Sequence, residues 1–346
     1  RFEKTSRVTK NDGALAGYPT ASLFSSTANT RIEDWYDRMG MSESKVFYCF
    51  DGQTPLTSAL LNVRYTFSRS DSEDPALYTL VDEQDGVYLY RNNFTLPAGF
   101  LLEDGWNLSS LDLEEDSSQP FDLQNRMASS TGVQGNLFDL VPVAESGPEA
   151  QFTATSSGHY YAYCDSNTVD TVKLSSESLT KTFTKVKYDY ILDLGYHEAG
   201  ELISLENEDD DDLNVSVALL NPSVLSLTLE TLGRQPFIVD SWDSTHVEGH
   251  IQVTTPGRLL LSIANEPGWT LKVDGTAVEI EEYDGMFLSA ELSEGEHEIS
   301  LTFFPAGLSA GAAVSLISLF AFLALLLRKR QKGGCPNPLL DSALTR

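Results

Sequence analysis

The sequence predicts a mixed α+β N-terminal part, then a mainly antiparallel β sandwich or jelly roll, and finally one transmembrane helix. Three observations predict this order. Short strand-like runs are mixed with brief helix signals over residues 1–135, and short β-type runs separated by Gly, Asp, Asn and Ser turns fill residues 136–305. An uncharged apolar run occupies residues 306–327, and a basic tail follows at residues 328–346. We take these four segments as the domain organisation.

The N-terminal part contains two clear helix signals. The run RIEDWYDRMG ends at Gly40, a residue typical of helix stops, and TPLTSALLNVRYTF changes from a short helix into a strand. The stretch from Glu103 to Gly135 differs, because it is rich in Asp, Ser, Gln and Gly and has little periodicity. We therefore expect a long connection or a loosely packed edge there, and we place a domain boundary near it.

The middle of the chain has the composition of short strands, as in GHYYAYCD, TVKLS, KVKYDYILDLG and LNVSVALL. One helix is expected within it, with Asn221 as N-cap, Pro222 at the first helical position and Gly233 as the stop. Further on, the Asp-Gly pairs at 274–275 and 284–285 predict tight hairpin turns. This pattern favours a β sandwich that runs almost directly into the apolar C-terminal segment.

The apolar run from Ala306 to Leu327 is long enough to cross a bilayer. As a helix it would rise about 33 Å, and an uninterrupted uncharged run of this length favours a membrane span over a buried core helix. A basic cluster follows at once, made of Arg328, Lys329, Arg330 and Lys332. By the positive-inside rule, this cluster places the tail in the cytoplasm and residues 1–305 outside.

An outside N-terminus requires an export signal or earlier membrane helices upstream. We expect the second case, in which the chain is the last portion of a polytopic membrane protein; a removed signal peptide is the alternative. Gly307 and Gly311 form a small-xxx-small face of the kind that packs against another helix, although glycine is also tolerated near a helix entrance. The expected partners are therefore the lipid bilayer and upstream membrane helices of the same polypeptide.

The charge of the chain restricts its other partners. There are 51 acidic and 23 basic residues, so the formal net charge is −28. Residues 1–327 hold 18 basic and 50 acidic residues, which gives −32 for the part placed mainly outside. Such a surface repels polyanions, so we expect no nucleic acid partner.

The cysteines and histidines give no clear site. Three cysteines and no CxxC pair exclude a disulfide framework, and whether Cys49 and Cys164 pair with each other stays open. His246 and His250 have the spacing of zinc ligands on a helix, but their β-like neighbours favour a pair of surface loop histidines. We interpret the isolated His159, His197 and His297 as satisfied edge or core residues.

No catalytic or metal constellation is expected in this chain. The run GLSAG matches the nucleophile elbow around Ser309, yet no histidine follows it, and it opens the membrane helix. The acidic run from Glu206 to Asp212 lacks the spacing of a calcium loop, so simple solvation is favoured over weak divalent cation binding. We predict no cofactor beyond such a weak cation.

Three tryptophans are candidates for stacking on a sugar, because a flat aromatic face matches the apolar face of a pyranose. They are Trp35, Trp106 and Trp242, of which the last two lie in polar, turn-rich stretches and lead the list. Core packing is the alternative for each of them. For Trp269, which belongs to an alternating strand, core packing is favoured.

Several longer runs occur in a familiar order. GYPTASLFSS, SALLNVRYTF and GVYLYRNNFTLPAGFL come first, and PGRLLLSIANEPGWTLKVDGTAVEI and FLSAELSEGEHEISLTFFPAG come later, directly before the helix. On these runs the chain resembles the C-terminal extracytoplasmic region and last transmembrane helix of the YfhO-type family of bacterial membrane proteins. The resemblance covers essentially the whole chain and is weakest in the middle β region.

The resemblance implies a multi-span, GT-C-like glycosyltransferase in the bacterial cell membrane. Such an enzyme would use a polyprenyl-phosphate sugar outside the membrane to decorate an anionic cell-envelope polymer such as lipoteichoic acid. Its catalytic carboxylate is expected in an early outer loop that this sequence does not include, so no catalytic residue is assigned here. The alternative is a non-catalytic, membrane-anchored surface protein whose β sandwich binds carbohydrate or protein. A hydrolase is disfavoured, because no nucleophile, metal or paired-carboxylate motif supports it.

Overall fold

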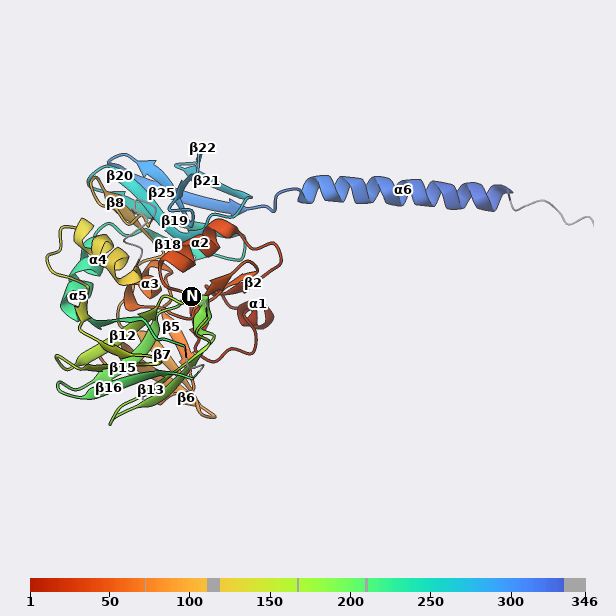
Figure 1. Ribbon diagram of the computed structural model, residues 1–346. Coiled ribbons are helices and arrows are strands. Elements are labelled where there is room, and N and C mark those ends of the chain that lie inside the picture. The colour runs from red at the N-terminus through yellow and green to blue at the C-terminus, as the bar shows by residue number, and fades with distance from the viewer. Residues whose placement is uncertain (72, 111–118, 167, 209–210, 333–346) are drawn as a thin grey trace, which may run out of the picture.

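The computed structural model describes residues 1–71, 73–110, 119–166, 168–208 and 211–332, the last four by their backbone alone. Two β sandwiches lie at opposite ends of the body with helices between them, and one long helix projects from the body (Figure 1). Most strand pairs are antiparallel. This arrangement confirms the predicted fold class of a β-rich domain followed by one C-terminal apolar helix.

Nine strands in the described part of residues 138–220 build the first sandwich. They are β9 (Phe138–Val141), β10 (Ala144–Ser146), β11 (Glu149–Thr153), β12 (Gly158–Cys164), β13 (Thr171–Ser175), β14 (Thr180–Thr184), β15 (Leu192–His197), β16 (Leu202–Asn207) and β17 (Val215–Leu220). One sheet has the order β15-β12-β17-β9 and the other β10-β11-β16-β13-β14. Phe152, Tyr160 and Leu205 belong to the buried core that these two sheets share.

The second sandwich takes one strand from the N-terminal part of the chain. Its strands are β8 (Gly99–Glu103), β18 (Ile238–Trp242), β19 (His246–Val253), β20 (Gly257–Ala264), β21 (Trp269–Val273), β22 (Thr276–Val278), β23 (Glu281–Tyr283), β24 (Phe287–Leu292) and β25 (Gly295–Phe303). The sheets have the orders β23-β24-β20-β8 and β18-β19-β25-β21-β22. Leu101 of β8 lies opposite Leu259 of β20, so a strand from before residue 135 completes this sandwich.

The N-terminal part also has two small sheets of its own. Their strands are β1 (Phe2–Lys4), β2 (Leu23–Phe24), β3 (Glu43–Ser44), β4 (Phe47–Tyr48), β5 (Tyr65–Ser68), β6 (Tyr78–Gln84) and β7 (Val87–Asn92). The orders are β1-β5-β7-β6 and β2-β4-β3, and β1 runs parallel to β5. Asp85 and Gly86 both have positive φ and form the β6–β7 hairpin turn. The two predicted Asp-Gly turns, at 274–275 and 284–285, adopt the same backbone signs and are confirmed.

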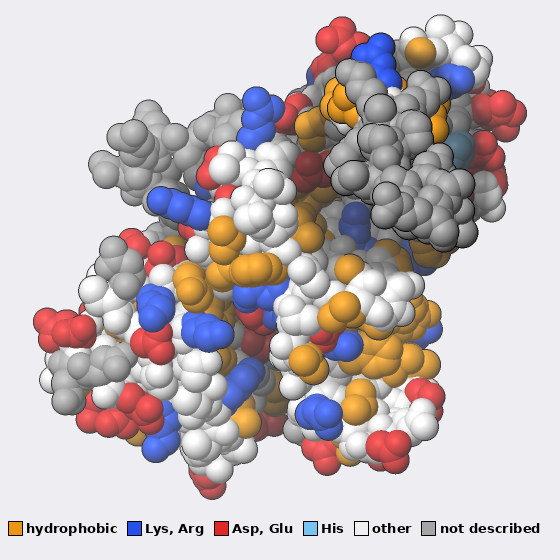
Figure 2. Space-filling view, turned by 90° about the vertical axis from the view of Figure 1, so that its right-hand side faces the viewer, with side chains coloured by type: hydrophobic (Ala, Val, Ile, Leu, Met, Phe, Trp, Pro, Cys, Tyr) orange, Lys and Arg blue, Asp and Glu red, His pale blue; other side chains and the backbone are white. Residues whose placement is uncertain are grey.

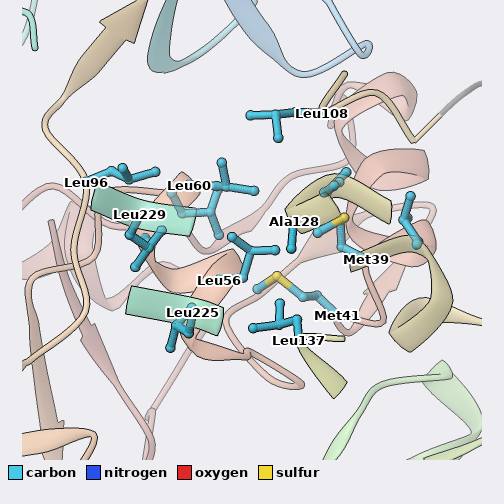
Figure 3. Close-up of a cluster of buried hydrophobic side chains, with 14 of the residues drawn as sticks. Met39, Met41, Leu56, Leu60, Leu96, Leu108, Ala128, Leu137, Leu225 and Leu229 are labelled. Carbon is cyan, nitrogen blue, oxygen red and sulfur yellow. The ribbon is translucent and has the colours of Figure 1, made fainter. Parts of the chain in front are cut away.

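Within the described residues, five helices and one 3₁₀ turn complete the body. They are α1 (Asp12–Ala16), α2 (Thr30–Arg38), α3 (Pro55–Leu60), α4 (Pro120–Ser130), α5 (Pro222–Leu232) and η1 (Val186–Tyr188). Side chains from several of these helices meet in a central core, in which Leu56 of α3 lies near Leu225 of α5 and Ala128 of α4 (Figure 3). The same core includes Tyr161 of β12 and Phe287 of β24, so it joins both sandwiches to the N-terminal part.

Helix α4 corrects the expectation that residues 103–135 form a long connection or a loosely packed edge. Pro120 occupies its first turn, where the missing N–H of proline costs nothing, and Phe121, Leu123 and Met127 are buried in the central core. Four apolar side chains within eleven residues are enough to bury one face, although the rest of the helix is polar. The expectation partly falls on residues 111–118, which lie outside the described residues.

The predicted helix at Asn221 is confirmed. The Asn221 side chain accepts hydrogen bonds from the backbone N–H groups of Ser223 and Val224, both at 3.2 Å, and Gly233 is the C-cap. We expect Asn221→Ala to lower the free energy of unfolding by about 1 kcal/mol, because two N–H groups of the first turn lose their acceptor. Chemical denaturation would measure this change. Ser223→Ala, on the exposed side of the same turn, is the matched control and should change stability by less than about 0.5 kcal/mol.

Helix α6 (Leu308–Lys332) projects away from the body and contains one candidate membrane span, Leu308–Arg328, with a mean hydropathy of 2.5. No part of this span is buried against the described protein. Gly307 has a φ of 80°, and within the described chain no heavy atom lies within 4 Å of where a Cβ would stand on Gly307 or Gly311. The small-residue face of the helix is therefore open, as a helix that contacts lipid or another helix requires.

Candidate functional site

A cleft of about 1130 Å³ lies between the N-terminal part and the first sandwich. One wall comes from β5, the following loop and β6, and the opposite wall comes from β14 and β15. Figure 2 shows a hollow between two lobes on the side of the molecule from which α6 projects. The two walls come from different sheets, because β6 belongs to an N-terminal sheet whereas β15 is an edge strand of the first sandwich.

An Asp–His–Asp bridge crosses the cleft. His159 of β12 is buried, and its Nδ1 lies 3.0 Å from an Asp74 oxygen while its Nε2 lies 2.7 Å from an Asp193 oxygen. Asp74 lies in the loop before β6, and Asp193 is on β15, where it also accepts the Gly195 N–H at 2.9 Å. The imidazole therefore ties the N-terminal part to the sandwich.

The charges of this bridge stabilise one another. Burial disfavours the charged imidazole, but the carboxylates of Asp193 and Asp74 outweigh it and raise the pKa of His159 to about 9. Burial likewise opposes the ionised form of Asp193, yet His159 and Lys181 hold its pKa well below the ordinary value. The pKa of Asp74 is lowered mainly by its hydrogen bond to His159, against the effect of burial. At neutral pH the bridge is therefore one imidazolium between two carboxylates.

The other carboxylates of the cleft are also compensated. Asp51 forms an ion pair with Arg7, and Glu73 accepts a hydrogen bond from the Ser68 hydroxyl at 2.7 Å. Burial raises the pKa of Glu73, which favours its neutral form. The cleft is thus close to neutral locally, although the whole chain carries −28.

The mouth of the cleft offers two cations and an accessible ring. Arg69 and Lys181 are exposed, and the Lys181 ammonium donates to the Asp193 carbonyl at 2.8 Å and lies 5.1 Å from the centre of the Phe183 ring. Tyr196 keeps 44% of its surface exposed at the rim. Exposed cations suit phosphate groups, and a tyrosine ring suits the apolar face of a sugar. This combination of groups is suited to binding a phosphate-bearing saccharide.

The cleft holds no evident nucleophile. Cys49, near the Asp51 wall, is buried and donates to Asp51, and burial raises the pKa of its thiol. Cys49 and Cys164 are both free, so the pairing left open by the sequence is absent. Cys335 lies outside the described residues. Among the described residues, no three His, Cys, Asp or Glu side chains form a group able to hold a metal ion.

The three tryptophans predicted as sugar contacts are scattered, and none of them lines this cleft. Trp35 of α2 is fully buried against Phe287, with ring centres 5.3 Å apart, so it has no face free for a ligand and is withdrawn as a candidate. Trp106 is half-buried against the central core. Trp242, at the end of β18, keeps 64% of its surface exposed.

The histidines show what single-sequence reasoning missed. His246 and His250 lie in strand β19 rather than in a loop, and His250 pairs with Asp240 at 2.9 Å on the surface. His159 had no local signal, because its two partners are 85 and 34 residues away. The acidic run from Glu206 to Asp212 lies partly outside the described residues, and Asp211 and Asp212 are exposed.

Comparison with known proteins gives one family. The family described as bacterial membrane protein YfhO matches residues 1–149 and 145–315. A curated relative, the uncharacterized protein YfhO of Bacillus subtilis (strain 168), is 30% identical over 94 residues. Those residues make up 27% of this chain and 11% of the relative, so the relative is more than twice as long.

The similarities to solved structures are weak. A mycobacterial arabinofuranosyltransferase AftD is 14% identical, with 48% of this chain and 14% of that chain covered at a TM-score of 0.20. A glycoside hydrolase 29 family member from an unknown rumen bacterium is 10% identical, with 54% and 42% covered at a TM-score of 0.23. TM-scores this low do not establish a shared fold, so neither protein informs the function of the cleft.

Proposed function

Since this chain belongs to the YfhO family of bacterial membrane proteins, we propose that it forms the extracytoplasmic C-terminal portion of a membrane glycosyltransferase. In this proposal the described body holds a saccharide next to a catalytic site that lies elsewhere in the polypeptide. The observation that carries it is the cleft between the N-terminal part and the first sandwich, with cations at its mouth and compensated carboxylates inside.

The chemistry of the cleft favours an anionic saccharide over a neutral one. The cations Arg69 and Lys181 stand at its mouth, whereas the charges of Asp74 and Asp193 are partly offset by His159, which lies between them. An anionic polymer would be repelled by most of an outer region that carries 50 acidic residues against 18 basic ones. The cleft would therefore be a favourable place for phosphate groups to approach.

The proposed donor and acceptor rest on the family resemblance alone. We propose a polyprenyl-phosphate sugar as the donor and a cell-envelope polymer such as lipoteichoic acid as the acceptor. Divalent cations bound weakly at the acidic surface would help such a polymer approach. The proposal puts the C-terminus in the cytoplasm and the cleft outside the cell, and the basic cluster that begins at Arg328 supports this orientation.

The proposal predicts that Arg69 contributes to phosphate binding. We expect Arg69→Gln to weaken binding of a short glycerol-phosphate oligomer to the detergent-solubilised chain about fivefold, because one exposed cation is worth about 1 kcal/mol. Titration calorimetry at low ionic strength would measure the dissociation constant, and added salt should reduce the difference.

Arg64→Gln is the matched control for this experiment. Arg64 is exposed and five positions before Arg69, but it does not line the cleft. Equal losses of affinity in the two variants would mean that phosphate binds through general charge and would count against the cleft. Absence of binding by the unaltered chain would remove the proposed site altogether.

Trp106 and Trp242 remain proposed sugar contacts outside the cleft. Trp242 is the stronger candidate, because more than half of its surface is free, whereas Trp106 packs partly on the central core. The open face of Gly307 and Gly311 is proposed to pack against upstream membrane helices.

The alternative, a non-catalytic surface protein with one membrane anchor, makes a different prediction for the whole gene. A membrane glycosyltransferase requires many hydrophobic spans of about 20 residues upstream of Arg1, together with an acidic residue in an early outer loop. A gene with a signal peptide as its only upstream apolar segment would exclude the enzyme and favour the binding protein.

A further inference from the structure

An exposed apolar tip lies at the end of α1 and β2. Val8 just before α1, Leu15 of α1 and Phe24 of β2 keep 96%, 78% and 52% of their surfaces exposed, and exposed apolar side chains that gather on one surface mark contact sites. We call these three side chains the tip surface. Figure 1 shows α1 and β2 at the edge of the body from which α6 leaves.

The tip surface is rigid rather than frayed. The Asn11 side chain donates to the Phe24 carbonyl at 2.9 Å and accepts the Phe24 N–H at 2.8 Å, so it clamps the start of α1 to β2. Phe24 pairs with Phe47 of β4, and the Asp12 carboxylate accepts the N–H groups of Val8 and Thr9. Apolar side chains that are exposed on a well-ordered backbone indicate an interaction surface.

A short chain of contacts joins the tip to the root of α6. The Asn29 side chain, five residues after Phe24, donates to the Asn265 carbonyl at 3.4 Å. The backbone carbonyl of Gly268, three residues after Asn265, accepts a hydrogen bond from the N–H of Phe304 at 3.0 Å. Phe304 and Leu308 are themselves 54% and 52% exposed, so apolar side chains occur at both ends of this path.

The connection between the body and α6 is short. Strand β25 ends at Phe303 and α6 begins at Leu308, so four residues separate them and span at most about 14 Å. The root of the second sandwich must therefore lie close to the bilayer when α6 is inserted. The tip surface lies on the same edge of the body, so it also comes close to the bilayer when α6 is inserted.

The charges around the tip suit the headgroup layer. Lys45 is exposed in the β3–β4 turn next to β2, and the Lys10 ammonium lies 3.9 Å from the centre of the Phe47 ring. The nearby Asp12 carboxylate is paired with Lys4 at 3.1 Å. Lysine side chains beside exposed apolar groups are typical of a surface that meets lipid, and here they occur in a chain with more than twice as many acidic as basic residues.

We infer that the tip surface rests in the headgroup layer of the bilayer that α6 spans and so provides a second contact with the membrane. The covalent anchor and the tip together would fix the tilt of the body relative to the membrane. This inference does not depend on what the cleft binds.

The test places a fluorescent reporter at the tip of the full chain in phospholipid nanodiscs. We expect the fluorescence added by Leu15→Trp or Phe24→Trp to fall about twofold in lipid brominated near the headgroup end of its acyl chains, since interfacial side chains lie about 5–10 Å deep. Leu202→Trp is the control, because Leu202 is 58% exposed on β16 of the first sandwich.

The inference requires quenching at the tip and none at Leu202. Tip fluorescence that is equal in brominated and ordinary lipid would overturn it, and a blue shift that grows with protein concentration would assign the tip to a second copy of the chain. Phe24→Asp provides an independent measurement with the same reporter at Leu15. It should reduce the quenching without unfolding the protein, because an ionised carboxylate leaves the headgroup layer and position 24 is on the surface.

Discussion

Replacing His159 by glutamine is expected to lower the free energy of unfolding by about 3–5 kcal/mol, the usual cost of removing one partner from a buried ion pair. The imidazole lies between the carboxylates of Asp74 and Asp193, at 3.0 and 2.7 Å, and is 7% exposed. Glutamine keeps hydrogen-bond donors on one nitrogen but leaves two facing carboxylates without a cation. Chemical denaturation of the chain in mild detergent would measure the loss, and the first sandwich should separate from the N-terminal part first.

The effect depends on pH in a defined direction. The pKa of His159 is raised from 6.5 to about 9, so the stabilisation from its charge is complete below about pH 6.5 and is lost as the pH rises through 9. The pKa values of Asp74 and Asp193 are lowered from 3.8, so their contribution is present above that pH and is lost on acidification. Lys181 and Glu73 also face this bridge, as a supporting cation and a half-buried carboxyl group.

We therefore expect the difference between the parent chain and His159→Gln to be largest between about pH 4 and 6.5 and to shrink toward pH 10. His250→Gln is the control, because His250 also has a carboxylate partner, Asp240 at 2.9 Å, but both are exposed. That variant should change stability little at any pH. A His159 variant whose loss of stability is the same at pH 6 and pH 10 would contradict a charged bridge.

The features predicted from the sequence are those whose cause is local. Asn221 lies directly before a proline and an apolar run, and Asp274 precedes a glycine, so a few neighbouring residues decide each structure. The apolar C-terminal helix was evident for the same reason. By contrast, α4 is held by contacts of Phe121 and Met127 with distant parts of the central core, which no window around residue 120 contains.

The candidate site is non-local throughout, which explains why no local pattern in the sequence indicated it. Asp74, His159 and Asp193 come from the two walls of the cleft and are unremarkable in their own neighbourhoods. The pairing of strands β8 and β20 is also non-local, because it joins residues on opposite sides of the boundary expected near residue 135. Chain order therefore predicts the strands well but does not predict which of them share a core.

Trp35→Ala is expected to cost about 3–5 kcal/mol of unfolding free energy, as large aromatic truncations in a core do. The Trp35 ring is fully buried, packs edge-on against Phe287 at 5.3 Å and also contacts Tyr36 at 5.5 Å. Phe287 belongs to β24, so this ring joins α2 to the second sandwich and its loss leaves a cavity at their junction. Denaturant unfolding would measure the change.

Trp242→Ala is the matched control, because the same side chain is removed from a site that is 64% exposed, and it should change stability by less than about 0.5 kcal/mol. These two variants also distinguish a tryptophan that packs in the core from one that contacts a sugar, a distinction that the sequence left open. Loss of a sugar contact should weaken saccharide binding and leave stability unchanged. Loss of a core residue should lower stability and leave saccharide binding to the folded protein unchanged. Trp35→Ala with native stability would mean that the α2 face is not part of the core and would return Trp35 to the candidates for a sugar contact.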